Sequence, residues 1–162
     1  MRETNGCLTP ADLTKILGDI TVHGVYKALK THHIEVISTQ SRRKKIPPLE
    51  IRKLLIERGF TYPYRNISFQ IVKGGVGKTS LSYAQGLRAS HYGAKVLLID
   101  LDQQGNLTRS FKIEARDFPV WLNIFRDNIP ISQAIIKLTE TLDLIPSNLN
   151  NSRLDLEFTQ AS

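Results

Sequence analysis

The chain has 162 residues, of which 41% are hydrophobic and 23% are charged. This composition is typical of a globular protein and excludes a disordered chain, and no apolar stretch approaches the ~20 residues that a transmembrane helix needs. The single cysteine, Cys7, excludes an internal disulfide and fits the reducing conditions of the cytoplasm. The first residues lack the apolar core of a signal peptide, so we expect a cytoplasmic protein of one domain or two small ones.

The net charge of +7 is unevenly distributed along the chain. Residues 1–64 hold 11 Lys and Arg against 6 Asp and Glu, a net charge of +5, whereas residues 65–162 hold 11 against 9, a net charge of +2. Three of the four histidines also lie in the first part. A basic segment indicates a polyanionic partner, although a charge excess is more often only a solvated surface.

The first predicted elements are two short helices joined by a tight turn. Thr9 is a helix N-cap followed by Pro10 at the first helical position, and a second helix begins at Thr21 after the turn at 18–20. Two short helices separated by about three residues that include a glycine form a helix-turn-helix, whose second helix enters the major groove of DNA. The polar face of that second helix holds the candidate DNA contacts Thr21, His23, Tyr26, Lys27 and Lys30.

A basic hairpin and a third helix are predicted next. Residues 34–37 have the apolar pattern of a strand, and Pro47-Pro48 opens a helix that Gly59 ends. We interpret residues 1–64 as a winged helix-turn-helix that binds double-stranded DNA; a small helical dimerisation module and a merely solvated basic loop stay open as alternatives. The candidate contacts of the wing, which would meet phosphates and carry no sequence information, are Arg42, Arg43, Lys44 and Lys45.

A linker with a proline, residues 61–66, places a domain boundary near residue 64. Apolar and polar residues then alternate over 67–71, which predicts a strand. A glycine-rich loop follows, and apolar residues at helical spacing predict a helix that ends at Gly93. Strand, loop and helix in this order bind phosphate, because the loop amides and the helix N-terminus point at the anion. The predicted nucleotide-binding residues are Lys73, Gly74, Gly75, Val76, Gly77, Lys78, Thr79 and Ser80.

Two residues of this loop have individual roles in phosphate chemistry. Lys78 is placed to reach the β- and γ-phosphates of a nucleoside triphosphate, and the Thr79 hydroxyl is placed to ligate Mg²⁺. The alternative, a chance glycine-rich turn, does not account for the strand and helix patterns on either side. The sequence therefore predicts a site for a nucleoside triphosphate with magnesium.

A second candidate segment follows the apolar run at 96–99. An uninterrupted run of Val, Leu and Ile predicts a parallel strand covered on both faces. Asp100 and Asp102 come directly after it, at the edge where open α/β sheets bind ligands. We also predict a helix over 132–138 and a third strand over 142–145. The predicted fold class is α/β, with a parallel sheet and flanking helices in residues 65–162.

Two motifs carry a resemblance to a known family. The sequence KGGVGKT at 73–79 resembles the deviant Walker A family of ATPases, which includes ParA partition proteins and MinD. Residues 100–108 are similar to the ParA pattern DxDPQGNxT, with Gln103 in place of the proline. The resemblance implies the first part of a P-loop ATPase domain, with ATP and Mg²⁺ as cofactors.

The resemblance also implies roles for single residues. In this family the extra lysine, here Lys73, reaches the nucleotide of the partner subunit in an ATP-dependent homodimer. Asp102 would orient or activate the attacking water, and Asp100 would lie nearer the Mg²⁺ shell. The implied catalytic residues are therefore Lys73, Lys78 and Asp102, and the implied metal-binding residues are Thr79 and Asp100.

Residues 1–64 resemble the MerR-like winged helix-turn-helix that precedes the ATPase in larger plasmid-type ParA proteins. This resemblance implies autorepression through operator DNA, a ParB-type centromere-binding partner and association with the nucleoid or a plasmid. A ParA-type sheet has more strands than residues 65–162 predict, so we expect only part of the ATPase domain, with the third strand leaving an unpaired edge. The alternatives are a DNA-binding repressor without ATP turnover and a MinD-like positioning ATPase.

Overall fold

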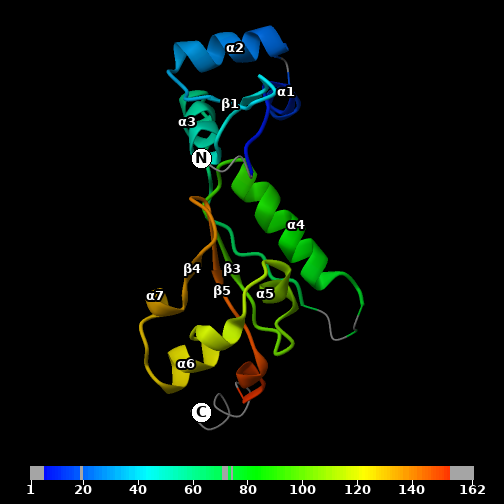
Figure 1. The fold of residues 1–162 in the computed structure, drawn as a ribbon, viewed down its shortest axis with the longest axis vertical. Helices are drawn as coiled ribbons and strands as arrows, with labels where there is room; N and C mark the ends of the chain where they lie inside the picture. The colour runs from blue at the N-terminus through cyan, green and yellow to red at the C-terminus, as the bar shows by residue number, and fades with distance from the viewer. Residues whose placement is uncertain (1–5, 19, 71–72, 74, 154–162) are drawn as a thin grey trace. The chain divides into compact units, whose positions relative to one another are not determined.

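The computed structural model describes residues 6–18, 20–70, 73 and 75–153, and Figure 1 shows its helices and strands. The chain forms two compact units. The first contains the residues up to 67 together with 87–95, and the second contains 68–86 together with the residues from 96 onward. Among the described residues, none of the helices combines the length and apolar character needed to cross a bilayer. The domain division near residue 64 stays a prediction.

The first unit contains three helices and a short hairpin. The helices are α1 (Pro10–Leu17), α2 (Val22–Thr31) and α3 (Pro48–Glu57), and strand β1 (Ile37–Ser38) pairs antiparallel with β2 (Lys44–Lys45). These elements lie where the sequence predicts two helices, a hairpin and a third helix. Their interpretation as a MerR-like winged helix-turn-helix stays a prediction.

Side-chain caps begin the first two helices. The Thr9 N–H donates to Asp12 Oδ2 at 2.9 Å, and the Asp12 N–H donates to Thr9 Oγ1 at 3.2 Å, which is a reciprocal capping box. The Thr9 hydroxyl also donates to Asp12 Oδ2 at 2.7 Å, and the hydrogen bonds from the Thr9 hydroxyl and the Thr9 N–H lower the pKa of Asp12 below its usual value. Thr21 Oγ1 accepts from the Gly24 N–H at 3.1 Å at the start of α2. Both helix starts are thus determined by local sequence.

The core of the first unit is apolar and comes from all three helices. An antiparallel bridge between Leu8 and Ile46 closes it, with N···O distances of 3.0 and 2.8 Å. The residues with fully buried side chains come from α1, α2, α3 and this bridge: Leu13, Val25, Ile46, Ile51 and Leu54. Burial of this set stabilises the unit by the hydrophobic effect.

The end of helix α4 (Lys78–His91) and the residues after it also belong to the first unit. Arg52 Nη1 donates to the Gly93 carbonyl at 3.0 Å, and the Tyr62 hydroxyl donates to the Tyr92 carbonyl at 2.7 Å. The Arg52 guanidinium also lies 4.2 Å from the centroid of the Tyr62 ring. Gly93 has a φ of 81°, and a Cβ there would lie 2.7 Å from the Arg52 backbone N, so only glycine fits this position.

The described residues of the second unit form a three-stranded sheet in the order β3-β5-β4. Strand β3 (Val96–Ile99) pairs parallel with β5 (Leu142–Ile145), and β4 (Ile136–Lys137) pairs antiparallel with β5. Helix α4 approaches β3 closely, because a Cβ at Gly86 would lie 2.8 Å from Leu98 Cδ2. The parallel pair of the predicted α/β sheet is confirmed.

Short helices follow β3 and β5 in the same unit. They are α5 (Asn106–Ser110), α6 (Trp121–Arg126), α7 (Ile131–Ala134) and two 3₁₀ turns, η1 (Ala115–Asp117) and η2 (Leu149–Arg153). Figure 1 shows α6 and α7 between α5 and β4 along the chain.

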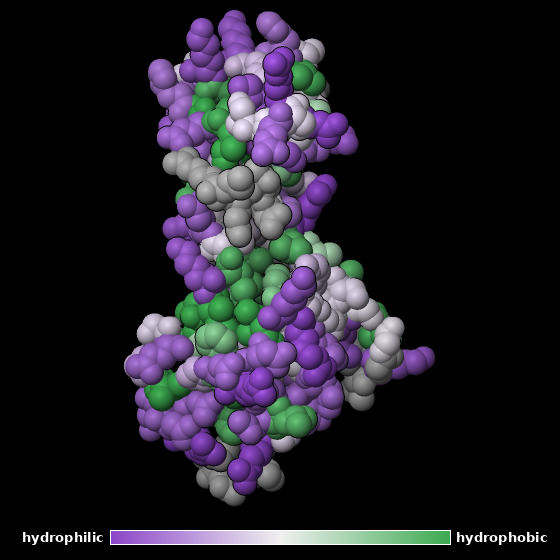
Figure 2. Space-filling model, in the orientation of Figure 1, coloured by the Kyte–Doolittle hydropathy of each residue, from purple (hydrophilic) through white to green (hydrophobic). Residues whose placement is uncertain are grey.

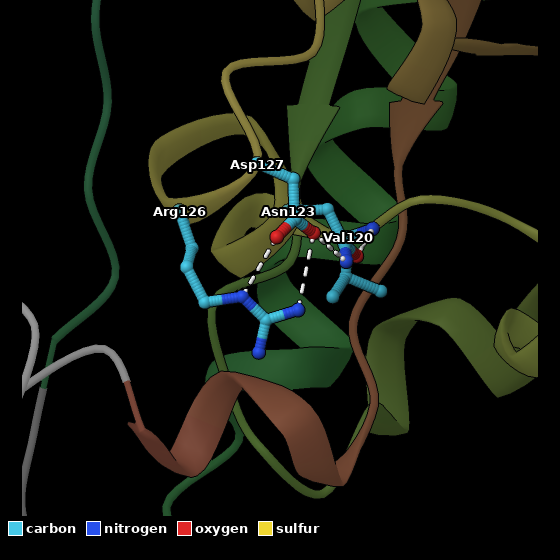
Figure 3. A network of polar contacts seen from close by, with 4 residues as sticks. All are labelled: Val120, Asn123, Arg126 and Asp127. Carbon is cyan, nitrogen blue, oxygen red and sulfur yellow. Dashed lines mark hydrogen bonds and ion pairs between the residues drawn. The ribbon is translucent and has the colours of Figure 1, made fainter.

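Polar side chains hold both ends of α6 (Figure 3). Asn123 Oδ1 accepts from the Val120 N–H at 2.9 Å at the helix start, and Asn123 Nδ2 donates to Asp127 Oδ2 at 2.9 Å. Arg126 donates to both oxygens of Asp127, at 2.7 and 3.1 Å. The hydrogen bonds from Arg126 and Asn123 lower the pKa of Asp127 below its usual value. The network therefore fixes the helix that carries the buried Leu122.

The strand predicted over 67–71 is wrong for residues 67–70, while residue 71 lies outside the described residues. Alternation gives these residues the pattern of a strand, but a strand forms only where a neighbour accepts and donates its backbone hydrogen bonds. Within the described part of the sheet, no ladder reaches 67–70, and the Ile67 residue is 58% exposed. Residues 67–70, which precede the phosphate loop in the chain, are therefore not part of the described sheet.

Two further predictions about the strands need correction. The helix predicted over 132–138 stops at Ala134, because Ile136 and Lys137 pair with β5 as β4. Strand β5 is consequently central in the sheet, so the predicted unpaired edge at this strand is wrong. Residues 132–138 have apolar residues at helical spacing, but the backbone hydrogen bonds with β5 favour a strand at 136–137. The β-branched isoleucines at 135 and 136 also favour extended backbone.

Strand β3 is covered on one face rather than on two. Leu97 and Ile99 are 43% and 42% exposed, whereas Val96 and Leu98 are half-buried. Figure 2 shows hydrophobic side chains gathered over the part of the second unit that carries the sheet. The apolar run at 96–99 predicted burial on both faces of the strand. That prediction is wrong for the face that carries Leu97 and Ile99, which is exposed among the described residues.

Candidate nucleotide-binding site

The predicted phosphate loop lies immediately before α4. Gly75 and Gly77 have φ values of 73° and 88°, a backbone conformation that favours glycine. Helix α4 begins at Lys78, and the Leu81 N–H donates to the Gly77 carbonyl at 2.8 Å in its first turn. Gly74 lies outside the described residues. The first N–H groups of a helix point out of its N-terminus, so this end of α4 is suited to an anion.

The loop is open where a ligand would enter. A Cβ built at Gly75 or Gly77 meets no atom within 4 Å, and Val76 is exposed. Lys78 Nζ donates to the Lys73 carbonyl at 3.3 Å, so the Lys78 side chain folds back over the loop toward Lys73. An ammonium group, backbone donors and open space are what a polyphosphate group requires.

The described residues near this loop could supply some, but not all, of the oxygen ligands of a magnesium ion. Thr79 is half-buried in the first turn of α4, next to Lys78, and its hydroxyl is a hard oxygen donor. The described residues hold no cluster of three or more His, Cys, Asp or Glu side chains. These residues fit an ion that is held mainly by phosphate oxygens and water, which is the usual way in which proteins hold Mg²⁺.

The two aspartates after β3 differ in their surroundings. Asp100 is 4% exposed, and its Oδ2 accepts from the Thr108 N–H at 2.9 Å and from the Thr108 hydroxyl at 2.7 Å. Burial raises the pKa of Asp100, while the hydrogen bonds from Thr108 and from the Asp102 N–H oppose that rise. Asp102 is exposed, and its Oδ1 accepts from the Gln104 N–H at 2.9 Å. Asp102 is thus the more accessible of the two carboxylates.

Sequence reasoning missed the buried polar residues beneath these aspartates. Thr108 Oγ1 accepts from the Ser147 N–H at 2.9 Å, at the exit of β5. Asn151 Nδ2 donates to Ser147 Oγ at 2.7 Å, and Asn151 Oδ1 accepts from the Leu122 N–H at 3.1 Å. Two sequence signals were available: Thr108 is the last residue of the motif at 100–108, and Thr108 and Ser147 both lie in polar stretches after apolar strands. The hydrogen bonds join the ends of β3 and β5 to α6.

The predicted DNA-binding residues are placed at the surface of the first unit. Thr21 is the N-cap of α2, and its hydroxyl oxygen already accepts from Gly24. Lys45 is half-buried on β2, and Lys44 Nζ donates to Ser38 Oγ at 3.0 Å across the hairpin. Figure 2 shows hydrophilic side chains over the part of this unit that carries α2. The other predicted contacts are all exposed: His23, Tyr26, Lys27, Lys30, Arg42 and Arg43.

A protein-family model described as an AAA domain matches residues 64–162, which include the phosphate loop and both aspartates. The chain belongs to this AAA-domain family. The match covers well over half of the chain.

Three curated proteins are similar to parts of this chain. The cell division protein PomZ of Myxococcus xanthus is 37% identical over 125 residues, 74% of this chain and 39% of PomZ. The sporulation initiation inhibitor protein Soj of Bacillus subtilis is 39% identical over 88 residues, 52% of this chain and 34% of Soj. The chromosome partitioning protein ParA of Caulobacter vibrioides is 33% identical over 103 residues, 62% of this chain and 38% of ParA. The matched part of the chain thus spans less than two fifths of each relative.

Proposed function

We propose that this chain is a ParA-type partition ATPase that binds ATP with Mg²⁺ through residues 73–80. The observation that carries the proposal is the open glycine loop at the start of α4, with the Lys78 ammonium folded back over it. Membership of the AAA-domain family and similarity to PomZ, Soj and ParA support it. Phosphoryl transfer needs mainly positioned positive charge, and this loop supplies it.

Each site residue has a role in the proposal. The amides of the loop and of the first turn of α4 bind the phosphates, Lys78 neutralises charge on the β- and γ-phosphates, and the Thr79 hydroxyl holds Mg²⁺. Mg²⁺, when bound, screens the charge that develops on the phosphate oxygens. The exposed carboxylate of Asp102 orients the attacking water at the carboxyl edge of β3. Asp100 lies close behind it and is oriented by Thr108.

Lys73 is proposed to act across a homodimer. It is exposed, and a cation that reaches a neighbouring nucleotide stabilises transition-state charge in the manner of an arginine finger. We predict that Lys73→Ala abolishes ATP-dependent dimerisation and lowers the hydrolysis rate by roughly 10³-fold, the lower end of the contribution of such a cation. Sedimentation velocity with ATP–Mg²⁺ and a phosphate-release assay measure the two effects.

The matched control for Lys73→Ala is Lys137→Ala, which removes an exposed lysine on β4 of the same unit. The control should dimerise and hydrolyse ATP like the unmodified protein. Dimerisation and turnover that survive Lys73→Ala would show that Lys73 has no role in trans. Hydrolysis at background in the unmodified protein would instead favour a DNA-binding repressor without turnover.

We also propose that the first unit binds double-stranded DNA. The support is the exposed basic surface on α2 and the hairpin, together with the net charge of +5 on residues 1–64. Operator binding with autorepression, a ParB-type partner and association with nucleoid or plasmid DNA belong to the same proposal. The ParB-type partner is supported by the similarity to a chromosome partitioning ParA.

A filter-binding titration against salt tests DNA binding. Each neutralised phosphate contributes about −0.9 to the slope of log K against log salt concentration. We predict that replacing both Arg42 and Arg43 with alanine makes the slope less negative by about 2, whereas Arg58→Ala, an exposed control at the end of α3, leaves it unchanged. A slope near zero for the unmodified chain would eliminate DNA binding by it.

A further inference from the structure

We propose that Thr108 is a positioning residue for the ATPase site, because its hydroxyl joins Asp100 to the end of β5 and so fixes the loop that carries Asp102. This inference rests on the proposed ATPase function and deepens it. Thr108 does not reach the nucleotide in this account. It acts through Asp100 on the exposed carboxylate of Asp102.

The Thr108 hydroxyl both donates and accepts a hydrogen bond inside the second unit. It is buried, it donates to Asp100 Oδ2 at 2.7 Å, and it accepts from the Ser147 N–H at 2.9 Å. The ladder between β3 and β5 ends at Ile99 and Ile145, and the Asp100 N–H donates to the Ile145 carbonyl at 3.0 Å just beyond it. Thr108 therefore continues the connection between the two strands past the last backbone pair.

Asp100 in turn restrains the backbone of Asp102. The second oxygen of Asp100, Oδ1, accepts from the Asp102 N–H at 3.2 Å. From Asp102 the loop turns back, because the Gly105 N–H donates to the Asp102 carbonyl at 2.8 Å. Gly105 is itself packed against β5's exit, where a Cβ would lie 2.6 Å from the Ser147 carbonyl. The backbone of Asp102 is held on both sides, and both connections end at Thr108 or Ser147.

Only a residue with a hydroxyl group preserves this arrangement. Valine has nearly the shape of threonine, but it leaves a buried carboxylate without one donor and the buried Ser147 N–H without its acceptor. The structure would relieve this by moving the Asp100–Asp102 loop. Catalysis is sensitive to such movement, since a displacement of about 1 Å can cost 10²-fold in rate. Serine keeps both hydrogen bonds and loses only a methyl group.

The test compares Thr108→Val with Thr108→Ser in ATP hydrolysis. We expect the valine variant to lower kcat by about 10²-fold with KM and the affinity for a fluorescent ATP analogue within threefold, and the serine variant to restore kcat to within threefold. In an Asp102→Ala background, Thr108→Val should have little further effect on kcat, because the residue acts through Asp102. Thr139→Val, at an exposed site in the same unit, is the control.

Three outcomes would overturn the inference: an unchanged kcat in Thr108→Val, failure of serine to restore it, or an undiminished effect in the Asp102→Ala background. If circular dichroism shows that the valine variant does not fold, Thr108→Cys replaces it in the same comparison with Thr108→Ser. We expect this variant to lower kcat as well, because a thiol is a weaker donor and acceptor than a hydroxyl. Absence of hydrolysis by the unmodified protein contradicts the proposed function. Hydrolysis that Thr108→Val leaves intact contradicts only the role of Thr108.

Discussion

Replacing Lys78 with alanine is expected to weaken ATP binding by about 100-fold. Charge-assisted hydrogen bonds contribute about 1.5–3 kcal/mol each, and each 1.4 kcal/mol corresponds to a tenfold change in affinity. The Lys78 ammonium group already lies over the loop, 3.3 Å from the Lys73 carbonyl, so it needs little reorganisation to reach a phosphate. Titration of a fluorescent ATP analogue in the presence of Mg²⁺ measures the effect.

The control for Lys78→Ala separates charge at the loop from charge on the surface. Lys112→Ala removes an exposed lysine from the same unit and should leave the affinity for ATP unchanged. Circular dichroism should show that both variants keep their helices, because Lys78 is at the first position of α4 and contributes little to its packing. Equal affinities for Lys78→Ala and the unmodified protein would mean that the loop is not the phosphate site.

Leu54→Ala is expected to destabilise the first unit by about 2–5 kcal/mol, the usual range for a buried leucine. Leu54 is fully buried on α3, in a core that also contains Leu13, Val25 and Ile51. Since small domains are stable by only 5–15 kcal/mol, this loss is a large fraction of the total. Hydrogen exchange of the amides of α1, α2 and α3 reports the loss for this unit separately.

The same helix supplies a matched control. Ile56 is 49% exposed and lies two positions from Leu54, so Ile56→Ala should change the protection by no more than about 0.5 kcal/mol. Comparing the two variants tests whether the side of α3 that carries Leu54 faces the core and the side that carries Ile56 faces solvent. Similar losses for the two variants would contradict the packing of this unit.

The helix starts could be predicted from sequence because their causes are local. Thr9 and Asp12 cap α1 from within four residues, and Thr21 caps α2 in the same way. Gly75 and Gly77 of the phosphate loop have positive φ as the motif requires, and α4 begins at Lys78. Local chemistry of this kind can be read without knowing which elements are neighbours.

The strands could not be predicted as well because pairing is not local. The alternation at 67–70 has no ladder partner among the described residues, whereas residues 136–137 gain one from β5 and leave the predicted helix. For the same reason the structural roles of Thr108 and Asn151 could not be predicted, because their hydrogen-bond partners Ser147 and Leu122 lie 39 and 29 residues away in the chain. A polar residue in a loop shows its role only after the fold places it beside a strand end.

Isothermal titration calorimetry of ATP–Mg²⁺ into the unmodified protein tests the central claim most directly. The central claim is that the loop at 73–80 binds a nucleoside triphosphate through its amides and Lys78. It predicts a saturable heat with one site per chain, and an affinity that Lys78→Ala lowers by about 100-fold. No binding heat from protein whose β3 and β5 amides, in the same unit as the loop, remain protected in hydrogen exchange would contradict it.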